Sequence, residues 1–198
     1  MLALLERPAL ENFVASMDAV VAAERDPGVT AACAAALLVP ALADDTLLEA
    51  RHQEPFDDRY RQHVVHVHPE GRYSVVALVW RPGHETPIHD HRCWCVVGVW
   101  RGIERETTYD LHAAGGREWL AVRDSTICRP GDVSVLVPPE EDIHRVENAG
   151  DELAISVHVY GADIAALGSS INETFDLPVL ERAPARPVAW RVSRRARN

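Results

Sequence analysis

The stretch Gly83-His84-Glu85-Thr86-Pro87-Ile88-His89-Asp90-His91 decides the fold and the chemistry that we expect of this chain. It lies between two apolar runs, Tyr73 to Trp80 and Trp94 to Trp100, that both have the composition of β-strands. On an extended segment, residues i and i+2 point to the same face, so His89 and His91 can grip one metal ion together. Because two imidazoles leave most of a coordination sphere empty, the pair requires a further ligand from elsewhere in the chain.

The spacing around this pair resembles the two motifs of the cupins. The first motif is matched, in order, by Gly83, His89, His91, Cys95 and Gly102, and the second by Gly131, Pro139, His144 and Asn148. Two positions depart from the usual pattern: Cys95 replaces a glutamate and Glu141 replaces a glycine. The resemblance implies a mainly β fold, the cupin barrel (double-stranded β-helix, jelly-roll) with N-terminal helices. It also implies that His144 completes the metal site of His89 and His91.

A second resemblance narrows the class. Pro87-Ile-His-Asp-His91, followed by Ser156-Val-His158-Val-Tyr160, is similar to the thiol dioxygenases, the family of cysteine dioxygenase and 3-mercaptopropionate dioxygenase. The similarity extends from about Tyr60 to Gly161. It implies Fe(II) as cofactor, and O₂ and a small thiol (cysteine, 3-mercaptopropionate or a related cysteine-derived thiol) as substrates. The expected product is the sulfinate.

Length and composition agree with one globular domain that carries a helical appendage. The chain has 198 residues and a formal net charge of −10, and such an acidic surface argues against a nucleic-acid partner. No apolar stretch has the length of a membrane span, and the first residues do not read as a signal peptide. Four cysteines do not make a disulfide framework, so we expect reduced thiols in a cytoplasm. Monomer and homo-oligomer both remain open.

The pattern along the chain divides it into three parts. Residues 1–55 read as a helical segment packed on the barrel, with helices over 8–24 and Thr30 to Leu42. Pro40 is expected to mark a break or the start of another helix, and Asp44 or Asp45 to cap a short helix through Ala50. Residues 56–175 read as the cupin barrel, and residues 176–198 as an extended strap and a loose basic tail. Besides the two apolar runs named above, the expected strands are Tyr60 to His68, Arg105 to Tyr109, Trp119 to Arg123, Ser125 to Arg129, Val133 to Val137, His144 to Asn148 and Leu153 to Tyr160.

Other histidines receive structural interpretations. His66 and His68 form a second His-x-His pair, which we interpret as a polar face near a turn because no later histidine is placed to complete a site there. For the same reason His52, His84 and His112 are expected on the surface or in loops.

Three neutral imidazoles on a divalent ion leave a charge of about +2 and three open positions of an octahedron. Such a site attracts a thiolate, a second substrate donor and dioxygen. A zinc-type site with Cys95 as a fourth ligand is the structural alternative.

Ser156, His158 and Tyr160 alternate along one strand and therefore face the same way. They form either a polar ladder that satisfies itself inside the barrel or a catalytic relay. The resemblance favours the relay, with Tyr160 orienting dioxygen or a polar group of the substrate, and His158 and Ser156 fixing its orientation.

The expected substrate-binding residues are Tyr60 and Gln62 on one face of the first strand, and Arg92 and Cys95 near the metal loop. In the cysteine enzymes that this chain resembles, an arginine stands in the position of Gln62. The bacterial 3-mercaptopropionate branch has glutamine there and a compensating arginine soon after the Tyr-Gly-Ala segment, but residues 161–170 contain none. Arg92 and Arg81 are the possible carboxylate donors near the metal loop, whereas Arg61 faces away by alternation.

Cys95 and Tyr160 are expected side by side in the metal pocket. In the animal cysteine dioxygenases, a cysteine at the position of Cys95 forms a thioether with the tyrosine. The alternative is a free buried cysteine that fills space, and Cys93 is the weaker candidate for the crosslink.

Two other functions use the same residues. One is another metal-dependent cupin enzyme, such as a non-thiol dioxygenase or an isomerase. The other is a non-catalytic cupin that binds small molecules.

Overall fold

The computed structural model describes residues 8–139 and 142–181 of the chain. Its helical elements are α1 (Pro8–Ala22), α2 (Pro27–Leu42), the 3₁₀ helix η1 (Ala50–Gln53) and the short α3 (Ile164–Leu167). Its strands are β1 (Arg61–Val67), β2 (Ser74–Trp80), β3 (His89–His91), β4 (Cys95–Arg101), β5 (Glu104–Ala114), β6 (Arg117–Cys128), β7 (Val133–Leu136), β8 (His144–Asn148), β9 (Ala154–Tyr160), β10 (Ile171–Thr174) and β11 (Val179–Leu180).

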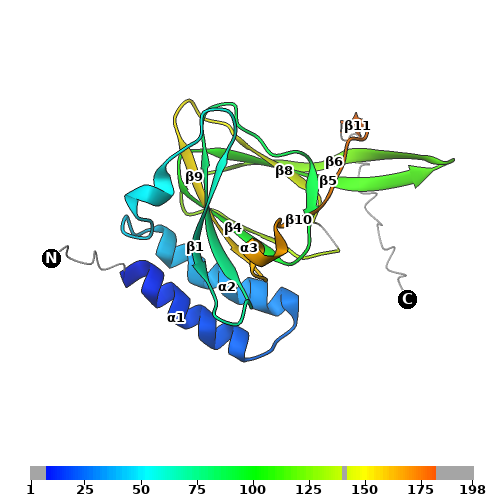
Figure 1. The fold of residues 1–198 in the computed structure, drawn as a ribbon. Helices are drawn as coiled ribbons and strands as arrows, with labels where there is room; N and C mark the ends of the chain where they lie inside the picture. The colour runs from blue at the N-terminus through cyan, green and yellow to red at the C-terminus, as the bar shows by residue number, and fades with distance from the viewer. Residues whose placement is uncertain (1–7, 140–141, 182–198) are drawn as a thin grey trace, which may run out of the picture.

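The strands form two facing sheets, and this confirms the predicted cupin barrel with N-terminal helices. One sheet has the order β1-β2-β9-β4-β7, and the other has the order β10-β3-β8-β5-β6-β11. Apart from the parallel pair of β11 and β6, the neighbouring strands are antiparallel. Both sheets are visible around the open centre of the ribbon in Figure 1.

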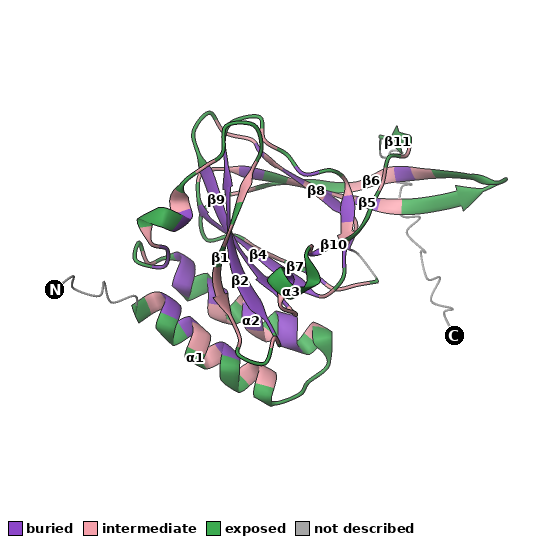
Figure 2. Cartoon of the chain, viewed as in Figure 1, coloured by how far each residue is buried: buried purple, intermediate pink, exposed green. Residues whose placement is uncertain are grey.

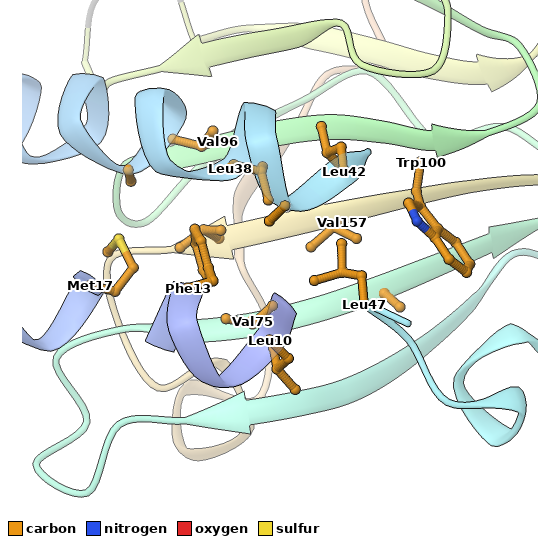
Figure 3. Close-up of a cluster of buried hydrophobic side chains, with 14 of the residues drawn as sticks. Leu10, Phe13, Met17, Leu38, Leu42, Leu47, Val75, Val96, Trp100 and Val157 are labelled. Atoms are coloured by element: carbon orange, nitrogen blue, oxygen red, sulfur yellow. The ribbon is translucent and has the colours of Figure 1, made fainter. Parts of the chain in front are cut away.

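The central strands of the first sheet, β2, β9 and β4, are buried on both faces, and each face has its own partner. Along β9, Ile155, Val157 and Val159 belong to the apolar cluster that α1 and α2 complete, whereas Ser156, His158 and Tyr160 point the other way. Figure 3 shows the helix side of this arrangement, with Leu10, Phe13 and Met17 of α1 next to strand residues such as Val75 and Val157. The N-terminal helices therefore cover the outer face and leave the inner face to the barrel interior.

A glycine allows α2 to lie close to the sheet. A Cβ on Gly98 of β4 would lie only 2.7 Å from Leu42 Cδ1 and 2.8 Å from Leu38 Cδ2. Leu38 and Leu42 are both buried, so the helix cannot retreat without exposing apolar surface. The packing of α2 thereby fixes the position of β4, and with it the position of Cys95, whose side chain points to the inner face of the sheet.

Burial is concentrated at the centre of the molecule. Strands β2, β4 and β9 carry almost continuous buried residues, while the β5–β6 hairpin beyond the barrel is largely exposed (Figure 2). The buried polar residues of the barrel interior include Glu104, His158 and Ser156, which an apolar core alone would not contain.

The N-terminal helices correct two expectations. Pro40 does not break the second helix but lies inside its last turn, where α2 continues for two more residues. No helix runs from Asp44 to Ala50; Asp44 instead accepts hydrogen bonds from the backbone and hydroxyl of Thr46 in a turn. Turns compete with helices when a short acidic side chain bonds two residues ahead, which explains the second error.

The long hairpin corrects a third expectation. The two strands predicted over Trp119 to Arg123 and Ser125 to Arg129 form one strand, β6, and its partner β5 extends to Ala114. The register shifts between Thr108, opposite Asp124, and Tyr109, opposite Val122. Arg123 is thus the extra residue of a bulge, and a bulge interrupts the alternation without ending the strand.

One isolated histidine was also misplaced. His52, expected on the surface or in a loop, is only 5% exposed in η1, and its ring lies 6.1 Å from that of His63. His84 lies in a turn and His112 is exposed, as expected. His66 and His68 both pack on Tyr73 near the turn after β1.

The last described residues run along the second sheet. β10 pairs with β3, and β11 pairs with β6. The predicted strap and tail stretches Pro184 to Pro187 and Arg194 to Arg197 lie outside the described residues. Within the described part, no helix is long and apolar enough to cross a membrane.

Candidate metal centre and cavity

Two neighbouring strands bring three histidines together inside the barrel. His89 and His91 begin and end β3, and His144 opens β8 directly opposite His89 in the antiparallel register. One ring nitrogen from each of the three lies within 4.8 Å of the others, and all three residues are buried. The i, i+2 geometry and the cross-strand pair thus produce the three-histidine site that the sequence predicts.

The second nitrogen of each imidazole is held by an oxygen acceptor. His89 Nδ1 donates to the Pro87 carbonyl at 2.9 Å, His91 Nδ1 donates to Asp142 at 2.7 Å, and His144 Nδ1 donates to Glu106 at 2.8 Å. A neutral imidazole that donates through Nδ1 keeps its lone pair on Nε2. All three rings therefore present Nε2 to a shared ion.

Burial keeps the rings of His89 and His91 neutral. It lowers the pKa of His89 to about 3, with further lowering by the charges of His144 and His91. It also lowers the pKa of His91, although the hydrogen bond to Asp142 opposes the shift. Burial alone would raise the pKa of Glu106, but the hydrogen bond with His144 brings it below its usual value. Neutral rings at His89 and His91, with an ionised Glu106 carboxylate behind His144, suit the binding of a metal.

The donor set fits a divalent first-row transition metal. Three neutral imidazole nitrogens suit zinc, iron, copper or nickel, whereas magnesium and calcium prefer oxygen ligands. The donor set alone does not select among these metals.

A polar row leads away from the metal centre along the inner face of β9. Tyr160 Oη lies 3.1 Å from His158 Nδ1, and His158 Nε2 lies 3.0 Å from Ser156 Oγ. The indole Nε1 of Trp80 donates to Ser156 Oγ at 3.1 Å. The predicted same-face arrangement of the three residues is confirmed, and the row is continuous.

A small cavity of about 20 Å³ joins the row to the metal centre. Its lining includes the three candidate ligands, and its other polar members are Tyr60, Gln62, Thr86, His158, Tyr160 and Ser170. Tyr60 stacks on Trp80 with ring centroids 4.6 Å apart, while Gln62 is exposed and therefore lies at the mouth. Among the described lining residues there is no arginine.

Arg92 does not reach this cavity. Its side chain is exposed, and its Nε donates to the Ile171 carbonyl at 2.9 Å. Arg81 is also directed elsewhere, to Asp57 and the Phe56 carbonyl. Proximity in sequence to the metal loop misled the expectation, because both side chains leave the barrel at its surface.

Cys95 lies behind the cavity instead of lining it. It is fully buried and pairs directly with Tyr160 across β4 and β9. Its Sγ is 3.9 Å from His158 Nδ1, and burial raises the pKa of the thiol well above its usual value. Among the described residues, the group close enough to share one ion is His89, His91 and His144 without Cys95, so the geometry does not favour the four-ligand zinc alternative.

Sequence reasoning missed the carboxylates that orient the ligands. Asp142 holds His91 through both the ring and the backbone N–H, each at 2.7 Å, and Glu106 holds His144 from β5. Asp142 stands two residues before His144, and that spacing was its only signal. Glu106 belongs to a strand whose side chains alternate, and nothing in the chain marks it as facing inward.

Comparisons with known proteins agree with this geometry. The family model described as "Cysteine dioxygenase type I" matches residues 33–167, which is more than half of the chain. The cysteine dioxygenase type 1 of Rattus norvegicus is 28% identical over 92 residues, covering 46% of this chain and 45% of that protein. The Danio rerio protein is 27% identical over the same lengths. The match thus spans less than half of each of these relatives.

Two solved structures are among those similar to this chain. A double-stranded β-helix protein from Klebsiella pneumoniae has a TM-score of 0.42 and 24% identity, covering 57% of this chain and 85% of its own. An oxalate oxidase in complex with the substrate analogue glycolate has a TM-score of 0.43 and 19% identity, covering 61% of each chain.

Fold and site together define a cupin with a buried three-histidine metal centre. Within the cupins, this chain belongs to the cysteine dioxygenase type I family.

Proposed function

We propose that this protein is an Fe(II)-dependent thiol dioxygenase that oxidises a small thiol with O₂ to its sulfinate. The reaction adds both oxygen atoms to sulfur, R–SH + O₂ → R–SO₂H. The observation that carries the proposal is one cavity that joins three Nε2 donors to the Tyr160–His158–Ser156 row, in a member of the cysteine dioxygenase type I family. Iron held by His89, His91 and His144 would supply a Lewis acid for the thiolate and the redox chemistry for dioxygen.

The protein's own part is to bind and orient the substrates and to exclude water from the cavity. Tyr160 faces the metal centre with its ring centroid 6.2 Å from that of His91, so its hydroxyl is near any group held there. Burial raises the pKa of Tyr160 well above its usual value, so the phenol remains a hydrogen-bond donor. We assign to Tyr160 the orientation of dioxygen or of the substrate's polar group, and to His158 and Ser156 the positioning of Tyr160.

The lining residues support a substrate whose tail is neutral. Tyr60, Gln62, Thr86 and Ser170 offer hydroxyl and amide groups, and a carboxylate next to them would lack a cationic partner among the described residues. We propose that Gln62 at the mouth and Tyr60 beside it bind the tail of the thiol. A thiol with a neutral hydrogen-bonding end fits these groups better than free cysteine or 3-mercaptopropionate.

The experiment is oxygen uptake by protein loaded anaerobically with Fe(II), measured across thiols that differ only in the tail. The set contains 3-mercaptopropionate, its primary amide, cysteine and cysteamine, with the matched alcohols as non-thiol controls. We expect uptake with thiols alone, with the highest kcat/KM for the amide. Uptake with the alcohols would favour another cupin enzyme, and no uptake with any of the thiols would favour a non-catalytic binding protein.

A further inference from the structure

A buried carboxyl group ends the polar row on the side away from the cavity. Glu104 opens β5, is 1% exposed and lies next to Ser156, whose hydroxyl hydrogen-bonds its carboxyl group. Its Oε1 has no hydrogen-bond partner among the described residues. A fully buried carboxyl with one unpaired oxygen is costly, so its place at the end of the row requires an explanation.

The environment of Glu104 favours the protonated form. Burial raises its pKa to about 8, the Ser156 hydroxyl lowers it in part, and the charge of Glu106 on the same strand raises it further. Cys128 of β6, Asp132 before β7 and Ser134 of β7 also face this space, and none of them brings a positive charge. On its far side Glu104 borders a second cavity of about 10 Å³, close to the size of one water molecule.

Ser156 couples this carboxyl to the rest of the row because its hydrogen-bonding capacity is full. A hydroxyl donates once and accepts twice. Trp80 Nε1 always donates to it, so one lone pair and one hydrogen remain for His158 Nε2 and Glu104. Whichever of these two partners donates to Ser156, the other must accept from it.

Because Ser156 can donate only one hydrogen, the hydrogen bonds of the row can run in one of two directions. When Glu104 is protonated, it donates to Ser156, Ser156 donates to His158 Nε2, and His158 donates from Nδ1 to the Tyr160 oxygen. The hydrogen of the Tyr160 hydroxyl is then available to the cavity. When Glu104 is ionised, Ser156 donates to it, His158 donates from Nε2 to Ser156, and Tyr160 gives its hydrogen to His158 Nδ1.

We propose that Glu104 is the positioning residue that sets the direction of this row, so that its protonation decides whether Tyr160 presents its hydroxyl hydrogen to the cavity. The proposal rests on the proposed function only for its catalytic consequence. His158 can follow either direction as a neutral ring, because burial lowers its pKa well below the usual value and the two states differ only in tautomer.

The spectroscopic test reads the tautomer of His158 without turnover. Histidine-¹⁵N NMR is recorded on protein loaded with diamagnetic Zn²⁺, on both sides of the Glu104 pKa, with His158→Gln used to assign the signal. We expect wild-type His158 to change from Nδ1–H to Nε2–H as pH rises through about 8. Glu104→Gln keeps the shape of the side chain but has no titrating proton, so the tautomer of His158 in this variant should not depend on pH. The exposed Glu118→Gln on the hairpin is the matched control and should behave as wild type.

A second variant and a pH profile complete the test. Ser156→Ala retains Glu104 but cuts the row, so it should also remove the pH dependence of the tautomer, including in the event that Glu104→Gln does not fold. On the best thiol, kcat of wild type should fall above about pH 8, and this fall should be absent in Glu104→Gln. A single His158 tautomer throughout in wild type, or an unchanged transition in Glu104→Gln or Ser156→Ala, would overturn the proposal. If the transition occurs but no thiol is oxidised, the row acts as proposed and the thiol dioxygenase assignment fails.

Discussion

Cys95 on β4 and Tyr160 on β9 lie directly opposite each other in the antiparallel register, on the inner face of the sheet. Residues paired in this way have Cβ atoms about 4.5–5.5 Å apart. Because the side chains share one buried cluster beside the metal centre, the predicted proximity of the two residues is confirmed. Whether a thioether joins them is a prediction.

The first prediction concerns this crosslink. In iron-loaded protein that has turned over, we expect a joined Cys95–Tyr160 peptide lighter by two hydrogens than the separate peptides, with dioxygen as the oxidant. Cys95→Ser should lack it and Cys93→Ser should retain it, because Cys93 precedes the strand pairing. Peptide mass mapping decides, and separate Cys95 and Tyr160 peptides in fully active protein would exclude the crosslink.

The second prediction concerns the ligands. His144→Ala removes one of three donors and, with it, the cross-strand half of the site, so bound iron should fall to near zero. His112→Ala, an exposed histidine on the hairpin, is the control and should bind iron like wild type. Metal analysis after gel filtration measures both. Equal iron in His144→Ala and wild type would exclude His144 from the site.

The third prediction concerns Asp142, which sequence reasoning missed. Asp142→Asn weakens the acceptor that orients His91 and keeps its lone pair on Nε2. Metal affinity should fall about 10–100-fold, the usual effect of losing such a partner. Asp110→Asn, on the hairpin beside Arg123, provides the comparison. Competition with a chelator measures the affinities, and identical values for the two variants would contradict the role of Asp142.

The fourth prediction separates rate from metal binding. Tyr160→Phe removes the hydroxyl that faces the cavity but no ligand, so iron content should remain and kcat should fall on the order of a hundredfold or more. Tyr73→Phe is the matched control, because its hydroxyl bonds Asp18 on the outer side of the same sheet. Undiminished turnover in Tyr160→Phe would remove Tyr160 from the mechanism.

The fifth prediction is a pH dependence of stability. The pKa of Glu104 is about 8 in the folded state, against 4.5 for an unperturbed glutamate. Between these values the folded protein holds a proton that the unfolded chain releases, so the free energy of unfolding decreases as pH rises from about 4.5 to about 8. Glu104→Gln lacks this loss of stability with rising pH. From low pH to above pH 8, its free energy of unfolding should therefore rise relative to that of wild type by a few kcal/mol, since one pKa unit is about 1.4 kcal/mol. Urea unfolding at several pH values tests this, and parallel curves for the two proteins would contradict it.

Much of the fold was predictable because it depends on local patterns. The His89–His91 pair and the inward row of β9 follow from alternation, and His144 follows from the resemblance to the second cupin motif. The β6 bulge at Arg123 and the turn at Asp44 were not predictable in this way, because both are decided by hydrogen bonds that break the local pattern.

The polar partners of the site were beyond the sequence for a different reason. Glu104 and Glu106 come from a strand that reads as an ordinary polar segment, and only the pairing of β5 with β8 places them inside the barrel. Arg92 shows the opposite error: it is next to the ligands in the chain but bonds a surface carbonyl. A contact between distant strands leaves no trace in spacing along one strand.

The central claim is that both atoms of dioxygen are transferred to the sulfur of a thiol. Turnover of the best thiol under ¹⁸O₂ by the Fe(II)-loaded protein, followed by mass spectrometry of the product, tests this directly. The account predicts a sulfinate that carries two ¹⁸O atoms, with one O₂ consumed per thiol. A disulfide as the main product, or oxygen derived from water, would contradict it.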